Sequence, residues 1–222
     1  SVFNRRWKRV VMRVLILANG RTGSTTLMKG LANGLGCNYI AEPWNLDLVD
    51  NLPPIHHDID YHNLPEDVVV KVIVNVKQYL GFYMYWTNRP FDCSGLDWLD
   101  NASEAVFWYR FAQKFDKIIL LDRYDTQAKV VSALHAQHYE SWDGQYEFKK
   151  EIIPPYKNMK ELYIKEEVSS ELLKLLSRKL EVDITYYEEI FNNKQRQSYF
   201  GLPIDSKELC DNFLNTKYRY QR

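Results

Sequence analysis

Apolar residues along this chain form short runs of strand length, separated by stretches with helical spacing. The runs at 68–75 and 117–122 are rich in Val, Ile and Leu and have the length of buried strands. Leu27, Leu31 and Leu35 recur at helical spacing. Such alternation is typical of an α/β fold with a parallel sheet. The predicted strands are 11–18, 37–41, 68–75, 117–122 and 183–186, and the predicted helices are 24–35, 103–115, 125–139, 167–180 and 205–214.

Two long stretches, 43–66 and 140–160, follow neither period and contain several prolines. We expect them to be loops over the carboxyl edge of the sheet, where long loops usually carry function. Trp44, Trp142 and Tyr146 lie in or beside them. Their flat faces could stack on a sugar ring, although core packing is the ordinary role of any single aromatic residue.

The composition indicates one domain that spans 1–222. The chain has 222 residues, 45% of them hydrophobic, which is enough to bury a full core. Its 29 basic and 29 acidic side chains balance, so net charge gives no reason to expect nucleic acid or an anionic membrane as a partner. The three cysteines are scattered, no apolar run is long enough to span a bilayer, and residues 1–9 lack the apolar core of a signal peptide. We therefore expect a cytoplasmic protein with no membrane span.

The segment 15–27 is the most informative one, because an apolar strand runs into a Gly/Ser/Thr loop and then directly into a helical pattern. Gly20 and Gly23 allow a tight turn and a close approach of the backbone to a ligand. The first N–H groups of the following helix have no intrahelical acceptor and lie at the positive end of the helix dipole. The loop is therefore a candidate site for a phosphate or sulfate group.

The residues that this loop lacks narrow its function. The nucleoside triphosphatase pattern G-x-x-x-x-G-K-[ST] needs Gly and Lys where this chain has Ala18 and Ser24, which weakens an ATP-binding interpretation. Arg21 and the hydroxyls of residues 24–26 suit a tetrahedral anion held without magnesium. A plain strand-to-helix turn capped by Ser24 is the alternative.

The loop Arg21-Thr22-Gly23-Ser24-Thr25 resembles the R-[ST]-G-S-T loop of sulfotransferases, which binds the 5′-phosphosulfate of 3′-phosphoadenosine 5′-phosphosulfate. At the level of motifs this resemblance extends from about residue 13 to 204. It implies a P-loop-like three-layer sandwich, in which helices cover both faces of a central parallel sheet. The same resemblance implies 3′-phosphoadenosine 5′-phosphosulfate as the sulfuryl donor and a carbohydrate or glycolipid hydroxyl as the acceptor.

A second motif follows the predicted strand 117–122, which ends directly before Arg123, and the next predicted helix carries Ser132. In sulfotransferases an Arg and a Ser in this order hold the 3′-phosphate of the donor, so the resemblance implies that role here. The spacing of Arg123, Asp125 and Ser132 is similar to that of the bacterial trehalose-type enzymes, which commonly have Gln where this chain has Lys129. The two side chains can converge if the helix packs back against the sheet.

The third candidate is Glu42, which follows a predicted strand and precedes Pro43. Proline biases the preceding residue toward an extended conformation. Sulfuryl transfer to a hydroxyl needs a group that accepts the hydroxyl proton, and a carboxylate within hydrogen-bond reach suffices. Trehalose-type and carbohydrate sulfotransferases place a Glu in this register, and in the trehalose type it is the general base. The resemblance therefore implies that Glu42 is the base, whereas without it a solvated loop Glu would be the default.

Histidines and one lysine need separate weighing. His56, His57 and His62 match no metal-ligand spacing, and sulfuryl transfer needs no metal, so we expect no metal site and keep these histidines as alternative bases. Lys71 lies inside an apolar run, where a charge either reaches out from a sheet edge or serves a site.

The sequence thus favours a sulfotransferase that uses Glu42 as base and Arg21 to neutralise the transferred group. A P-loop phosphotransferase and a phosphoadenosine-binding module without turnover are the alternatives. The residues expected to bind the donor are Gly20, Arg21, Thr22, Gly23, Ser24, Thr25, Arg123 and Ser132.

Overall fold

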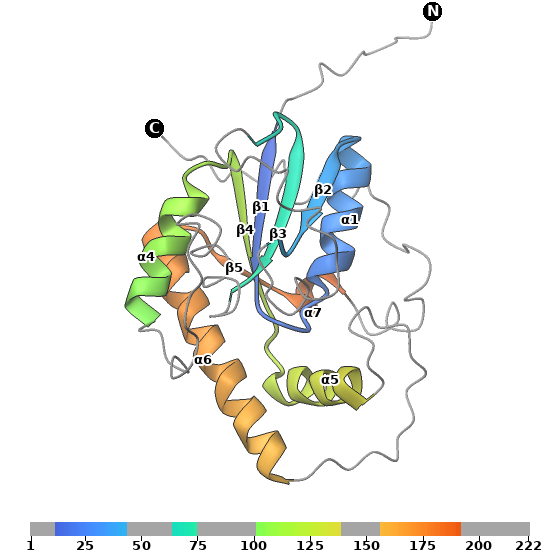
Figure 1. The fold of residues 1–222 in the computed structure, drawn as a ribbon, viewed down its shortest axis with the longest axis vertical. Coiled ribbons are helices and arrows are strands. Elements are labelled where there is room, and N and C mark those ends of the chain that lie inside the picture. Colours follow the sequence, from blue (N-terminus) through green and yellow to red (C-terminus); the bar gives the residue numbers. More distant parts are fainter. Residues whose placement is uncertain (1–11, 44–63, 75–100, 139–155, 192–222) are drawn as a thin grey trace, which may run out of the picture.

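The computed structural model describes residues 12–43, 64–74, 101–138 and 156–191. The strands in this part of the chain form one parallel sheet of five, in the order β2-β3-β1-β4-β5 (Figure 1). The predicted α/β fold with a parallel sheet is therefore confirmed. The strands are β1 (Arg13–Ala18), β2 (Asn38–Ala41), β3 (Val68–Ile73), β4 (Lys117–Asp122) and β5 (Ile184–Tyr186).

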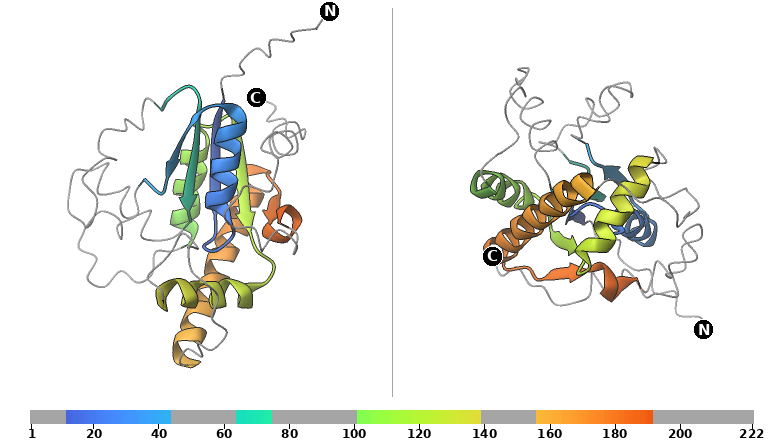
Figure 2. Two further views of the ribbon diagram at one scale, coloured as in Figure 1. Left: turned by 90° about the vertical axis from the view of Figure 1, so that its right-hand side faces the viewer. Right: turned by 90° about the horizontal axis from the view of Figure 1, so that it is seen from below.

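Helices cover both faces of the sheet, as the three-layer sandwich requires (Figure 2). α1 (Ser24–Leu35) packs on one face, against alternate residues of β1 such as Val14 and Ile16. α4 (Asn101–Ala112) and α6 (Tyr156–Leu180) pack on the other face, against the remaining alternate residues of β1, Leu15 and Leu17. Because β1 is buried on both faces, it reads in the sequence as a continuous apolar run.

The strand order creates a switch point at the centre of the sheet. The connection from β1 leads to β2 on one side, whereas the connection from β4 leads to β5 on the other. In open α/β sheets, ligands bind outside the carboxyl ends of the strands at such a point. The loop after β1 and the turn after β4 lie at this point, so they are where we look for a site.

α5 (Thr126–His138) lies across this carboxyl edge rather than along a face of the sheet (Figures 1 and 2). It packs against α6. The helix after β4 therefore comes close to the loop after β1 by passing beneath the ends of the strands.

The helices differ from the prediction near the carboxyl end of the described chain. α6 begins at Tyr156, so the predicted helix 167–180 is too short and the last residues of the stretch 140–160 are helical, not irregular. The amino-terminal part of α6 extends beyond the sheet (Figure 1), and residues 160–165 within it are mostly exposed, so they lack the apolar period that marks the later turns. α7 (Tyr187–Ile190) was not predicted. The predicted helix 205–214 and almost all of the stretch 43–66 lie outside the described residues.

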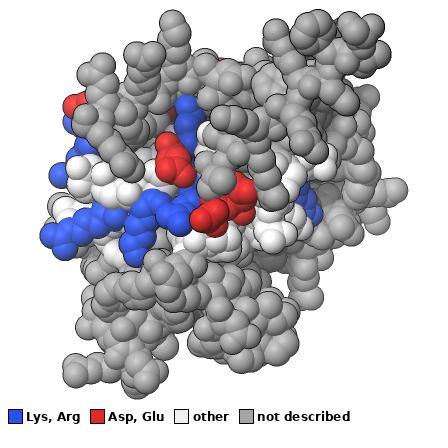
Figure 3. All heavy atoms as spheres, turned by 90° about the horizontal axis from the view of Figure 1, so that it is seen from above, with Lys and Arg blue, Asp and Glu red and all other residues white. Residues whose placement is uncertain are grey.

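The amino ends of the strands form the face shown in Figure 3. Among the described residues there, basic side chains form a short row and acidic side chains lie directly beside it.

We predict that the packing of α6 on the sheet can be tested with two substitutions in this helix. Leu176 is fully buried in the core cluster, so Leu176→Ala should lower the free energy of unfolding by about 2–5 kcal/mol. Ile164→Ala is the control, because that side chain is 47% exposed and its loss should change the free energy by less than about 1 kcal/mol. Urea denaturation measures both, and equal effects would contradict this placement of α6.

Candidate functional site

The loop between β1 and α1 is a tight turn that is held by its own contacts. Arg21 and Gly23 both adopt positive φ, 58° and 71°, and the hydroxyl of Thr22 donates to the carbonyl oxygen of Asn19 at 2.8 Å. The helix begins at Ser24, and Gly23 is its N-cap without a side-chain cap hydrogen bond. Ser24 is therefore the first residue of the helix and not its cap. The N–H groups of the first turn keep no intrahelical acceptor and point out of the end of α1.

Two aromatic rings near the end of the described residues, those of Tyr187 and Phe191, contact this loop. A Cβ added at Gly23 would lie 2.8 Å from an edge carbon of Phe191 and 3.2 Å from a ring carbon of Tyr187. Residue 23 must therefore be a glycine, both because its backbone is left-handed and because two rings approach it closely. α7, which carries Tyr187, covers the loop.

Arg21 joins the loop to α5. Its Nε donates to the hydroxyl oxygen of Ser132 at 2.8 Å, across 111 residues of sequence. The sequence motif predicts that Ser132 converges with Arg123 instead. In the structure the Arg123 guanidinium lies 4.7 Å above the ring of Tyr187, and its Nε is 3.5 Å from a carboxylate oxygen of Glu188. Arg21 and Ser132 are therefore brought together, and Arg123 lies toward α7.

A second polar group lies on the α1 side of the sheet. Lys71 occupies β3, whose neighbours are β1 and β2, so it does not reach out from a sheet edge. Its ammonium group donates to the hydroxyl of Thr25 at 3.1 Å and forms a short ion pair with Glu42. Lys71 is only 3% exposed. A buried ammonium thus connects the candidate base Glu42 to the first turn of α1.

Glu42 adopts a positive φ of 45°, so the expectation of an extended conformation before Pro43 is wrong. Its N–H continues the ladder between β2 and β3 by donating to the carbonyl oxygen of Lys71 at 2.8 Å. Its carboxylate bonds to the ammonium of the same lysine. This pair of contacts holds Glu42 in a conformation that costs an L-residue about 1–2 kcal/mol. Such outliers cluster at functional sites, which is consistent with a role for Glu42.

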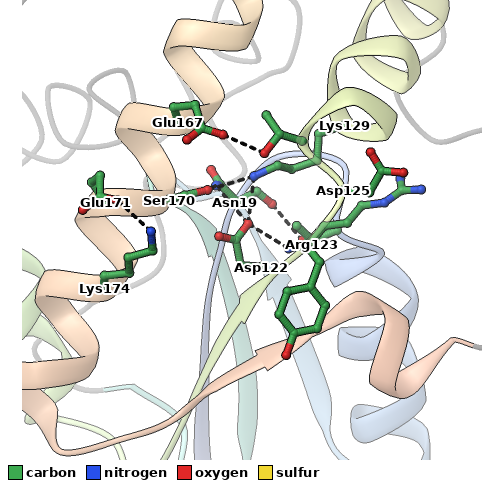
Figure 4. A network of polar contacts seen from close by, with 12 residues as sticks. Asn19, Asp122, Arg123, Asp125, Lys129, Glu167, Ser170, Glu171 and Lys174 are labelled. Carbon is green, nitrogen blue, oxygen red and sulfur yellow. Dashed lines mark hydrogen bonds and ion pairs between the residues drawn. The ribbon is translucent and has the colours of Figure 1, made fainter.

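A buried network lies behind the loop (Figure 4). The ammonium of Lys129, in α5, donates to Asp122 at 3.0 Å and to the hydroxyl of Ser170, in α6, at 2.9 Å. The side-chain amide of Asn19 donates to the same two residues, at 3.1 and 3.0 Å. Lys129 is fully buried. The network fixes the ends of β1 and β4 relative to α5 and α6.

Glu166, also in α6, contacts the loop from this side. Its Oε1 lies 3.7 Å from the position of a Cβ at Gly20, and its Oε2 is buried without a hydrogen-bond partner. Burial raises the pKa of Glu166 above its usual range, and the nearby ammonium of Lys129 lowers it in part. A carboxyl group with a raised pKa can donate as well as accept a hydrogen bond near the loop.

Several of these residues cannot be recognised from the sequence as part of a site. Lys71 stands out there without its partners, and Lys129 only as a departure from the trehalose-type pattern. Asn19, Ser170 and Glu166 carried no local signal, because their neighbours come from distant parts of the sequence. A charged residue at a helix position that faces the core, as Lys129 does, is the one sign that could have been read in advance.

No protein-family model matches this chain, and the comparison with curated proteins gave no match either. Among the described residues, no three His, Cys, Asp or Glu side chains gather so that they could hold a metal ion. Within the same residues, no helix is both long and apolar enough to cross a bilayer. His56, His57 and His62, the alternative bases, lie outside the described residues.

We predict that three Gly→Ala variants separate backbone strain from ring contact at Gly23. Gly36 has a φ of 65° and no neighbour within 4 Å of an added Cβ, so Gly36→Ala should cost about 1 kcal/mol of strain alone. Gly23→Ala should cost at least about 2 kcal/mol, because the rings must also move. Gly20→Ala meets only an ordinary contact and should change stability by less than about 0.5 kcal/mol. Thermal unfolding measures all three, and an effect at Gly23 equal to that at Gly36 would contradict the aromatic cover.

Proposed function

We propose that this protein transfers a sulfuryl group from 3′-phosphoadenosine 5′-phosphosulfate to a hydroxyl of a carbohydrate or glycolipid. The observation that carries the proposal is the hydrogen bond from Arg21 to Ser132. It joins the loop before α1 to α5, so that two helix N-termini and two arginines, Arg21 and Arg123, come from adjoining loops at one edge of the sheet. A donor with a 5′-phosphosulfate and a 3′-phosphate has one anionic group for each of these two arginines.

The residues of the loop would bind the reacting end of the donor. The amides of residues 20–25 would hold the 5′-phosphosulfate, and the guanidinium of Arg21 would neutralise charge as the bond to the leaving phosphate breaks. Arg123 would bind the 3′-phosphate, since its side chain is 9% exposed and its buried Nε makes no hydrogen bond. Ser132, whose oxygen accepts from Arg21, would add a hydroxyl donor.

Glu42 would accept the proton of the acceptor hydroxyl. Its position supports this role, because Lys71 connects its carboxylate to Thr25 in the first turn of α1. Lys71 would also place a positive charge beside the group in transfer. The acceptor itself is proposed from the resemblance to carbohydrate sulfotransferases alone.

A phosphotransferase is less well supported by the same contacts. P-loop nucleotidases hold magnesium with a loop hydroxyl and an acidic residue, and they bind the phosphates with a loop Lys. Asp122 ends β4 beside β1, but its Oδ1 already accepts hydrogen bonds from Asn19, Lys129 and the N–H of Arg123. Ser24 stands where that Lys would be.

We predict that Glu42→Gln keeps donor affinity and lowers the turnover number by roughly 10²–10⁴, the usual contribution of a positioned base. Sulfate-transfer assays on a panel of sugar hydroxyls, with donor titration beside them, measure the two effects separately. Glu181→Gln is the control, because Glu181 is exposed and also has a positive φ, 54°, but lies at the end of α6. Near-normal turnover of Glu42→Gln would remove Glu42 as the base and direct attention to His56, His57 and His62.

We predict that Arg123→Ala weakens binding of 3′-phosphoadenosine 5′-phosphate by about 2–3 kcal/mol, because a charge-assisted bond to a dianion is lost. Affinity for adenosine 5′-phosphosulfate, which has no 3′-phosphate, should change little. Calorimetry with both ligands measures the difference, and Arg178→Ala, an exposed arginine of α6, serves as the control. Equal losses for the two ligands would place Arg123 outside the 3′-phosphate site.

A further inference from the structure

A carboxylate from α7 lies at the N-terminus of α5. The N–H of Tyr124 donates to Glu188 Oε2 at 3.1 Å, and the N–H of Asp125 donates to Oε1 at 3.5 Å. The Nε of Arg123 lies 3.5 Å from the same Oε1. Asp125 caps the helix, since its side chain accepts the N–H of Ala128 at 2.8 Å. Two backbone N–H groups and one guanidinium thus surround a single carboxylate.

These three donors are the kind that binds an oxyanion. Backbone amides at a helix N-terminus and a planar guanidinium suit phosphate in geometry and in charge. The contacts to Glu188 leave binding capacity unused, because the buried Nε of Arg123 makes no hydrogen bond and Glu188 itself is 33% exposed. The guanidinium is held in place by the ring of Tyr187, 4.7 Å below it. A group with three oxygens would fit these donors better than one carboxylate does.

We propose that Glu188 competes for this anion position: its carboxylate occupies the turn 123–125 until a phosphate monoester displaces it. This inference rests on the proposed function, in which that monoester is the 3′-phosphate of the donor. The resemblance of the sequence accounts only for Arg123 and Ser132. The two backbone amides and the competing carboxylate come from the contacts of Glu188.

Displacement of Glu188 also affects the loop before α1. Tyr187, the neighbour of Glu188 in α7, and Phe191, which follows the helix, are the two rings that press on Gly23. A ligand that removes Glu188 from the turn 123–125 therefore disturbs the cover of the first anion position. The 3′-phosphate would open the loop that the 5′-phosphosulfate needs.

The test removes the negative charge of Glu188 and compares ligands with and without a 3′-phosphate. Glu188→Gln should bind 3′-phosphoadenosine 5′-phosphate about fivefold more tightly than the wild type, as expected when one partly exposed ion pair no longer competes. Its affinity for adenosine 5′-phosphate should rise by clearly less. Glu189→Gln is the matched control: Glu189 accepts from the N–H of Tyr186 at 2.9 Å and from the Tyr124 hydroxyl at 3.3 Å, so its loss loosens α7 without freeing the turn.

A second readout separates this inference from the proposed function. Inorganic phosphate, titrated while the amide signals of Tyr124 and Asp125 are followed by NMR, should shift them at lower concentration in Glu188→Gln than in the wild type. If phosphate shifts these signals as expected but 3′-phosphoadenosine 5′-phosphate does not bind, the anion site with its competing Glu188 is supported and the sulfotransferase is rejected. Binding of the nucleotide with equal or weaker affinity in Glu188→Gln, or an equal gain in Glu189→Gln, would overturn the inference and leave the sulfotransferase standing.

Discussion

The buried ion pair between Lys129 and Asp122 organises the carboxyl edge of the sheet, and the two side chains are 0% and 5% exposed. An ammonium can lie there only because Asp122 neutralises it and Ser170 accepts a further hydrogen bond from it. Asn19 donates to the same two acceptors. The end of β1, the end of β4, α5 and α6 are therefore fixed in one arrangement, since removal of either charge would leave the other buried and unpaired.

This arrangement determines what the carboxyl edge can do. With α5 held beneath the ends of the strands, Ser132 comes within reach of Arg21, and the turn after β4 presents its amides toward α7. On the opposite face of the sheet, Lys71 in β3 connects Glu42 to the first turn of α1 in a similar way. Glu42 and Ser132 are thus positioned by two buried cations, Lys71 and Lys129 respectively.

The features that could be predicted from the sequence are those that depend on a local pattern of residues. The spacing of Leu27 and Leu31 predicts α1, and the continuous apolar run 117–122 predicts β4, because burial against the sheet or within it imposes a pattern on neighbouring residues. The tight turn between β1 and α1 could be predicted for a similar reason, since a glycine at a position of positive φ is a local demand of the backbone. The first turns of α6 and the short α7 were missed, as they bury too little to leave a period. Long-range contacts such as Lys129 with Ser170, 41 residues apart, follow from the assembled layers and leave no local trace.

The proposed function requires that the carboxyl edge recognise a nucleotide with phosphates at both the 5′ and 3′ positions and bind it without magnesium. The decisive experiment is calorimetric titration of the wild-type protein with 3′-phosphoadenosine 5′-phosphate, and separately with ATP and magnesium. We expect 3′-phosphoadenosine 5′-phosphate to bind at least about tenfold more tightly, which corresponds to one strong charge-assisted contact. Tighter binding of ATP with magnesium, or no binding of 3′-phosphoadenosine 5′-phosphate, would contradict it.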